Sequence, residues 1–183
     1  FPPDDTSQRR LLRSLMNVRP PRPVSQEFLA VQDAYLQEET ARKGVTELFG
    51  MTPVEPGLYL WQGAITPLRV DAIVNAANSA MLGCFVPCHG CIDNAIHTYA
   101  GVQLRQECAS IMAGQEAEPT GSAKITKAYN LPCRYVLHTV GPIIYGSATE
   151  TDRKLLANCY GSCLELAAFY GRPSAALCCI STR

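Results

Sequence analysis

VDAIVNAANSAMLGCFVPCHGCIDNAIH, residues 70–97, predicts a strand, a long loop and the start of a helix. Residues 72–74 form a continuous apolar run, which is typical of a strand buried on both faces of a sheet. A polar turn containing Asn75 and Asn78 follows, and helical spacing begins near Ile92. In α/β folds ligands bind at the carboxyl ends of strands, facing helix N-termini whose free N–H groups favour anions. We therefore expect a ligand site in the connecting loop.

Soft metal ligands are concentrated in this loop. Cys84, Cys88, His89 and Cys91 lie within a span of eight positions, a composition that favours a tetrahedral site for zinc. The spacing permits a closed structural site with four ligands. It equally permits a site with three ligands, with Cys88 outside it, whose open position could serve catalysis. A loop without metal is the third alternative.

The composition indicates one well-filled domain. The chain has 183 residues, of which 47% are hydrophobic and 17% charged, and its formal net charge is zero. A disordered chain and a generally basic surface for nucleic acid are therefore not expected. Any binding of phosphate must be local and must depend largely on backbone groups.

The sequence carries no signal for a membrane. No apolar run approaches the roughly 20 residues that a membrane helix needs, and FPPDDTSQRR lacks the layout of a signal peptide. We therefore expect a soluble, cytoplasmic protein. Five further cysteines lie in apolar patterns and are expected to be free thiols in a reducing compartment: Cys108, Cys159, Cys163, Cys178 and Cys179.

Two segments divide the chain. Residues 1–52 are predicted to form a helical extension, with RPPRP at 19–23 separating two helices and Ser25 capping the second. This extension either packs on the domain or serves as an arm for docking a partner. Residues 53–183 alternate strand and helix patterns, which predicts a three-layer α/β/α fold with a mixed or mostly parallel sheet. The expected strands are 58–62, 70–75, 122–128, 135–140 and 175–180, and the expected helices are 92–112 and 151–170.

The order of motifs resembles the macrodomain family. The matching segments run from about Leu58 to the end: GAIT, VDAIVNAANS, IDNAIHTYAG, PTGSAKITKAYNLP, YVLHTVGP and the terminal ISTR. The loop GCFVPCHGCIDNAIH and the N-terminal helical segment are similar to the zinc-containing branch. In microbes that branch is often associated with a sirtuin-type ADP-ribosyltransferase and with modification of lipoyl-carrier proteins.

The resemblance implies roles for residues of the loop. Cys84, His89 and Cys91 match the zinc ligands, whereas Cys88 matches a variable position. Asn78 matches the residue that contacts the distal ribose of ADP-ribose. Asp93 matches the acidic residue that orients or activates the attacking water in related hydrolases, although an ordinary helix cap is the alternative for this residue.

Further residues match the nucleotide-binding part of the family pattern. Gly63, Ala64 and Ile65 correspond to positions near adenine and phosphate, and Ala64 replaces the usual aspartate that accepts from the adenine amino group. Ser181 and Thr182 lie where the second phosphate loop of the family begins. Because that loop is glycine-rich and continues beyond this point in the family, we expect a version that lacks its C-terminal portion.

The resemblance implies a zinc-dependent hydrolase that removes ADP-ribose from modified protein side chains. In that activity zinc would polarise a ribose or water oxygen and Asp93 would orient the water. A binding module for ADP-ribose with structural zinc and no turnover is one alternative. A deacylase acting on O-acyl-ADP-ribose is another. His97 and His138 are expected to be structural.

Overall fold

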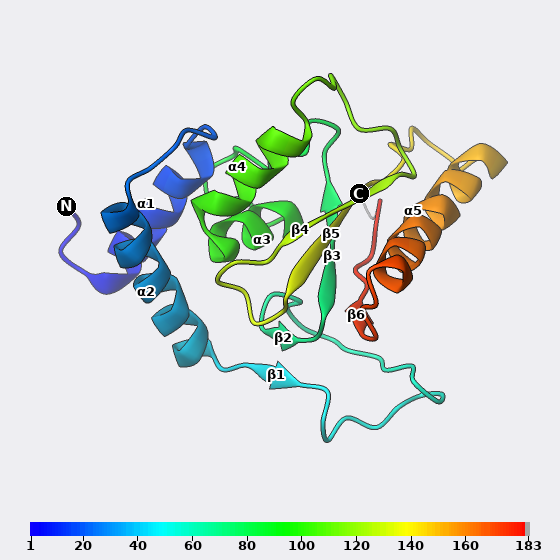
Figure 1. Cartoon of the computed structure of the whole chain (residues 1–183), viewed down its shortest axis with the longest axis horizontal. Coiled ribbons are helices and arrows are strands. Elements are labelled where there is room, and N and C mark those ends of the chain that lie inside the picture. Colours follow the sequence, from blue (N-terminus) through cyan, green and yellow to red (C-terminus); the bar gives the residue numbers. More distant parts are fainter. Residues whose placement is uncertain (182–183) are drawn as a thin grey trace.

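A four-stranded mixed sheet forms the centre of the protein. The computed structural model describes residues 1–181, and Figure 1 shows its arrangement. The strand order is β4–β5–β3–β6, in which β3 pairs in parallel with β5 and β6 while β4 is antiparallel to β5. The strands are β3 (Ala72–Ala77), β4 (Ala123–Lys127), β5 (Tyr135–Val140) and β6 (Ala175–Ala176).

Helices cover both faces of this sheet (Figure 1). The helices are α3 (Ile92–Ala100), α4 (Val102–Ile111) and α5 (Glu150–Phe169). Successive side chains of a strand point to opposite faces, so Ile73 packs with α3 and α4 while Val74 packs with α5. The predicted three-layer α/β/α architecture with a mixed sheet is confirmed.

The predicted helix 92–112 is two helices, α3 and α4. The chain breaks at Gly101, whose φ is +97°, a conformation that side chains other than glycine rarely adopt. An added Cβ at Gly101 would also lie 2.7 Å from Nε2 of Gln32. Apolar periodicity alone missed this break because both helices keep their apolar faces toward the same side of the sheet.

The N-terminal segment forms α1 (Asp5–Val18) and α2 (Gln26–Lys43), which lie outside α3 and α4 (Figure 1). The predicted cap is confirmed, since the Ser25 hydroxyl accepts from the N–H of Phe28 at 3.2 Å. Both helices bond to the layer beneath them. The side chain of Asn17 donates to Thr98 at 2.9 Å, and the N–H of Val102 donates to Gln32 at 3.0 Å.

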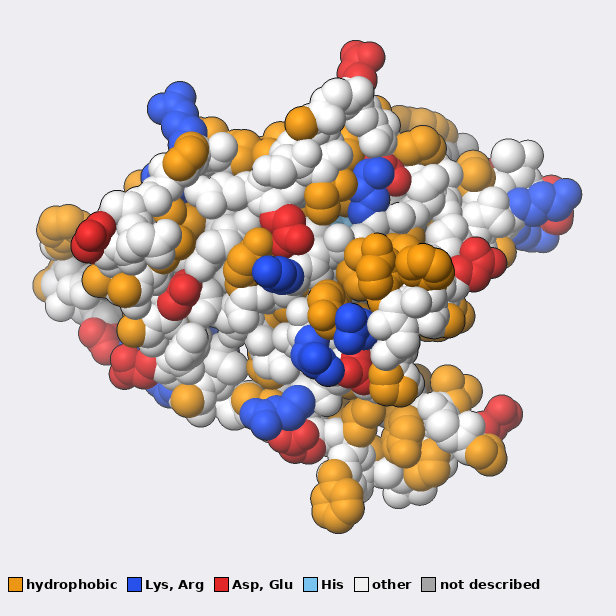
Figure 2. Space-filling view, viewed as in Figure 1, with side chains coloured by type: hydrophobic (Ala, Val, Ile, Leu, Met, Phe, Trp, Pro, Cys, Tyr) orange, Lys and Arg blue, Asp and Glu red, His pale blue; other side chains and the backbone are white. Residues whose placement is uncertain are grey.

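The predicted strand 58–62 is wrong. Between β1 (Thr46–Glu47) and β2 (Leu68–Arg69), which pair with each other in parallel, the chain runs out as a long loop. Leu60 is 82% exposed and its apolar neighbours are exposed as well. Figure 2 shows hydrophobic side chains gathered on this loop, at the lower right. Its short run of apolar and aromatic residues at 58–61 forms a strand only where a partner strand and a core face are available.

The expected terminal strand 175–180 is shorter than predicted. Pairing with β3 stops after Ala176. Beyond it the backbone is bound by the hydroxyl of Tyr160 in α5, which donates to the carbonyl of Cys178 and accepts from the N–H of Ile180. Cys108, Cys159 and Cys163 are buried, but Cys179 is exposed. None of the helices in residues 1–181 is long and apolar enough to cross a membrane.

Candidate metal and ADP-ribose site

The loop that follows β3 begins with a turn built by Asn78. Its side-chain oxygen accepts from the N–H of Ala80 at 3.1 Å, and its amide donates to the carbonyl of Gly83 at 3.1 Å. Such side-chain bonds to the local backbone are the usual way in which asparagine stabilises a turn. Asn78 itself is exposed, so a ligand can reach it.

Gly83 brings this turn close to α3. Its φ is +80°, and an added Cβ would lie 2.7 Å from the ring of His97. Both the backbone conformation and the space therefore require glycine. The next residue, Cys84, begins the group of possible metal ligands.

Cys84, His89 and Cys91 lie together. Their donor atoms all lie within 4.8 Å of one another, and Sγ of Cys84 is 3.6 Å from Nδ1 of His89. Tetrahedral zinc with bonds of about 2.3 Å to sulfur and about 2.1 Å to nitrogen places its ligand atoms roughly 3.6 Å apart. Two sulfurs and one imidazole nitrogen at this spacing fit zinc.

Cys88 does not join this group in the described part of the chain. Its backbone is left-handed, with φ +54°, and its thiol donates to the carbonyl of Arg10 in α1 at 3.4 Å. The side chain is therefore directed to the N-terminal helix. Of the two zinc arrangements that the sequence left open, the geometry favours three protein ligands.

Cys91 is the N-cap of α3, and its Sγ accepts from the N–H of Asn94 at 3.4 Å. The alternative prediction of Asp93 as the cap is wrong, since Asp93 lies in the first turn of the helix. Burial raises the pKa of the Cys91 thiol, while the hydrogen bond from the N–H of Asn94 acts in the opposite direction.

Asn94 and Arg13 hold the loop in place. Asn94 is fully buried, and its amide donates to the carbonyls of Val86 at 3.0 Å and Cys84 at 3.4 Å. Its oxygen accepts from Arg13 at 2.8 Å, while the same guanidinium donates to the carbonyl of His89 at 3.0 Å. The carbonyls of two candidate ligands are thereby tied to α1 and α3.

Asn17 supplies a second connection from α1. Its Oδ1 accepts from the N–H of Cys88 at 2.8 Å, and its Nδ2 donates to Thr98 at 2.9 Å. Arg105 of α4 adds a third, because its guanidinium donates to the carbonyls of Leu82 at 2.7 Å and Asn17 at 2.9 Å. The N-terminal helix α1 is thus part of the support of the loop.

Asp93 is buried beneath the loop, with 4% of its surface exposed. Oδ1 accepts from Asn75 at 2.8 Å and Oδ2 accepts from Asn78 at 3.3 Å. Burial raises the pKa of this carboxyl to about 6, although the hydrogen bond from Asn75 and the charge of Arg105 act in the opposite direction. Two amides therefore fix the orientation of this carboxylate.

Two histidines lie behind Asp93. Asn75 donates to Nδ1 of His138 at 3.1 Å, and Nε2 of that ring faces the Thr126 hydroxyl at 2.9 Å. Burial lowers the pKa of His138 to about 3, so the ring is neutral. His97 lies 3.6 Å from Oδ1 of Asp93, and burial lowers its pKa as well. The structural role expected for both histidines agrees with this burial.

The predicted nucleotide contacts are dispersed. Gly63 and Ala64 are exposed on the long loop before β2, where the carbonyl of Ala64 accepts from Trp61 at 3.1 Å. Ile65 packs against the core on the α3 side of the sheet. Ser181 donates to the carbonyl of Pro142 at 2.7 Å, just beyond β5. Thr182 lies outside the described residues.

The supporting residues Arg13, Asn17, Asn94 and Arg105 were not predicted from the sequence. The one available signal was Asn17, a polar residue within the helical segment LLRSLMNV. The structure buries it at 1% exposure, and a buried amide requires partners.

Comparison with known proteins places this arrangement in context. Residues 74–183 match the model of the Macro domain. A protein-ADP-ribose hydrolase of Treponema medium is 61% identical over all of this chain and 72% of its own length. A protein of the same name from Staphylococcus aureus is 52% identical over 94% of this chain, which spans 65% of that relative.

Solved structures give the same result. The Trypanosoma brucei macrodomain in complex with ADP-ribose has a TM-score of 0.67 and 33% identity, over all of this chain and 76% of that one. An Oceanobacillus iheyensis macrodomain mutant with ADPR has a TM-score of 0.59 and 38% identity, over 66% of this chain and 63% of that one. With these matches to sequence and fold, the chain belongs to the macrodomain family.

Proposed function

We propose that this chain removes ADP-ribose from modified protein side chains by hydrolysis, with zinc bound by Cys84, His89 and Cys91. The observation that carries the proposal is the position of Asp93. It is a buried carboxylate two residues after Cys91 and bonds directly to Asn78. The names of the relatives, protein-ADP-ribose hydrolases, support the same reaction.

Asp93 orients the attacking water or accepts its proton. A general base must be held within hydrogen-bond reach of its proton donor, and the amides of Asn75 and Asn78 keep this carboxylate in one orientation. Asn78 contacts the distal ribose from the surface of the loop. A ribose hydroxyl can replace its 3.3 Å contact with Asp93, which brings the sugar next to the carboxylate.

A zinc ion at the three ligands supplies Lewis-acid polarisation of an oxygen atom at neutral pH. The chain's own residues prepare this position. Arg13 and Asn94 fix the ligand backbone, and the bond from Cys88 to Arg10 leaves three protein ligands and one open position.

The nucleotide part of the substrate is bound by Gly63, Ala64 and Ile65 near adenine and by Ser181 and Thr182 near phosphate. Apart from Ile65, the described members of this set lie at exposed positions or at the carboxyl edge of the sheet. The modified partner is an ADP-ribosylated protein, for which a lipoyl carrier is the candidate that the resemblance supplies. The nine free cysteines suit a reducing cytoplasm.

A binding module without turnover is the second candidate, and Ala64 favours it. Replacement of the usual aspartate removes an acceptor for adenine, and weak positioning of a substrate lowers the rate steeply. A binding module with structural zinc would require a fourth protein ligand, and Cys88 does not provide it.

Release of ADP-ribose from an ADP-ribosylated protein tests the proposal. We expect release by the wild type and a loss of at least about 100-fold in Asp93→Asn, the scale of general-base catalysis. Calorimetry should find that this variant still binds ADP-ribose. Binding by the wild type without any release would establish the binding module, and release only from O-acyl-ADP-ribose would establish the deacylase.

A further inference from the structure

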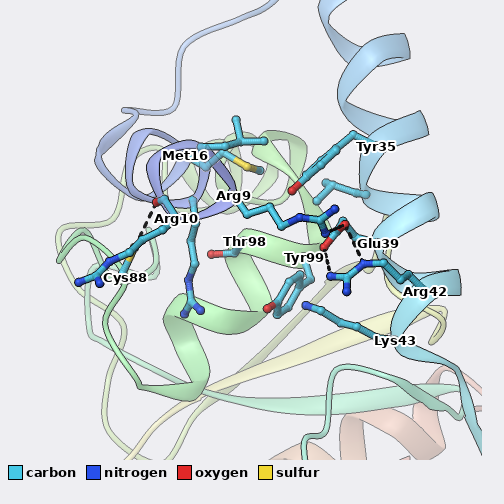
Figure 3. A pocket seen from close by; sticks show the side chains of 13 residues that line it. Arg9, Arg10, Met16, Tyr35, Glu39, Arg42, Lys43, Cys88, Thr98 and Tyr99 are labelled. Atoms are coloured by element: carbon cyan, nitrogen blue, oxygen red, sulfur yellow. Dashed lines mark hydrogen bonds and ion pairs between the residues drawn. The ribbon is translucent and has the colours of Figure 1, made fainter. Parts of the chain in front are cut away.

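A cavity of about 400 Å³ lies between α1, α2 and α3. Figure 3 shows it, with Tyr35, Arg42 and Lys43 extending from α2 and Tyr99 from α3. Its lining includes Cys88 of the metal loop but neither Asn78 nor Asp93. It is therefore distinct from the proposed ADP-ribose site, and its volume falls in the range of about 300–1,000 Å³ that is typical of sites for small molecules.

The cavity is strongly basic although the whole chain has no net charge. Five cationic side chains line it: Arg9, Arg10, Arg13, Arg42 and Lys43. Glu39 is the one carboxylate in this lining. A concave surface with four positive charges in excess focuses a positive potential and attracts anions.

Glu39 neutralises only part of this charge. It pairs with Arg9 and with Arg42, whose Nη2 lies 2.8 Å from Oε2. Each guanidinium carries five N–H donors, so one carboxylate leaves several of them for a ligand. Within residues 1–181 Lys43 forms no ion pair with a carboxylate, and its Nζ lies 3.6 Å over the ring of Tyr99.

Neutral donors complete the site. Burial and the charge of Glu39 raise the pKa of Tyr35, so its hydroxyl stays protonated at neutral pH. In Figure 3 the side chains of Arg9, Arg42, Lys43 and Tyr99 converge on the space between α2 and α3. Cations from two helices with a neutral hydroxyl nearby form a donor set suited to the oxygens of one multivalent anion.

We propose that this cavity binds a small multivalent anion that carries phosphate or carboxylate groups. The concave surface between three helices, about 400 Å³ in volume, has the size of a site for a small molecule. A network made only to join α1 to α2 would need one cation for Glu39, whereas Arg9, Arg42 and Lys43 all converge here.

The cavity is connected to the metal loop. The carbonyl of Arg10 accepts from the thiol of Cys88, and Arg13 donates to the carbonyl of His89. An anion that draws α1 toward α2 therefore also stabilises the loop. We expect the melting temperature to rise when the anion binds, as for any ligand selective for the folded state.

Calorimetry with the full chain tests the proposal, with pyrophosphate in one arm and tricarballylate in the other. Both arms are run with saturating ADP-ribose present, so that its site is not available. If the cavity prefers phosphate groups, pyrophosphate should bind more tightly than tricarballylate. If it prefers carboxylate groups, tricarballylate should bind more tightly. Either order supports the proposal, whereas no binding in both arms would overturn it.

Matched variants locate the binding. Lys43→Gln should weaken it at least about threefold, since a charge-assisted bond at a partly exposed site is lost. Glu39→Gln should tighten it, because the competing carboxylate is gone, while Glu38→Gln outside the lining should change nothing. Equal affinity in the wild type and the three variants would place the anion elsewhere and refute the proposal. If Glu39→Gln proves unstable, equal affinity in the wild type and Lys43→Gln refutes it alone.

Discussion

Replacement of Asn17 by alanine should weaken both the fold and the metal loop. Asn17 is 1% exposed and makes one hydrogen bond with the N–H of Cys88 and another with Thr98. The variant leaves the Cys88 N–H without its partner beside the loop. It also removes one of the connections from α1 to α3, the hydrogen bond to Thr98.

The magnitude follows from these two bonds. An ordinary hydrogen bond contributes about 1 kcal/mol, and a buried group left without a partner costs about 1–3 kcal/mol. We expect a loss of about 2–4 kcal/mol in the free energy of unfolding. For a domain of this size the melting temperature should fall by roughly 5–12 °C.

Denaturant unfolding and competition for zinc with a chelator measure the two effects. Asn158→Ala is the matched control, since Asn158 is an exposed helical asparagine in α5, and it should change neither quantity. The reasoning is refuted if Asn17→Ala unfolds within about 0.5 kcal/mol of the wild type, the ordinary range for surface substitutions.

Three further variants test other parts of the account. Gly83→Ala should destabilise the protein by more than Gly114→Ala, because both have positive φ but only the first places a Cβ against His97; equal melting temperatures would contradict this. As the pH falls from 6 to 4, the wild type should lose up to about 1.4 kcal/mol more unfolding free energy per pH unit than His138→Gln. The reason is that the unfolded histidine takes up a proton that the folded one, with a pKa of about 3, does not. Parallel plots of unfolding free energy against pH for the two proteins would exclude this effect of His138. Ala64→Asp should tighten binding of ADP-ribose severalfold by accepting from the adenine amino group, and equal affinities in calorimetry would count against that contact.

Local patterns predicted the sheet and its covering helices well. The apolar runs of β3 and β5 and the stripe of Cys159 and Cys163 on α5 all lie in the core. The metal ligands are close in sequence, so their proximity was predictable from spacing. Their support was not, since Asn17 and Cys88 are 71 positions apart and a pattern in one segment carries no information on such a contact.

The errors have the same origin. Residues 58–62 are mostly apolar and aromatic, as in a strand, but within residues 1–181 no partner strand lies beside them and their side chains are exposed. Gly101 interrupts a helical pattern that continues in phase on either side, so the turn is visible only in its φ of +97°. Tertiary context decided both cases.

The central claim is that hydrolysis depends on zinc held by three ligands, and a metal titration tests it most directly. Protein stripped of metal with a chelator is given increasing amounts of zinc. Two quantities are measured at each step: the amount of bound metal and the release of ADP-ribose from an ADP-ribosylated protein. Release should rise and level off at one equivalent of zinc in the wild type and in Cys88→Ser. Cys91→Ser should neither retain the metal nor recover release, with circular dichroism reporting whether its fold is kept. Full release by stripped wild-type protein, or loss of zinc from Cys88→Ser together with its fold, would contradict the account.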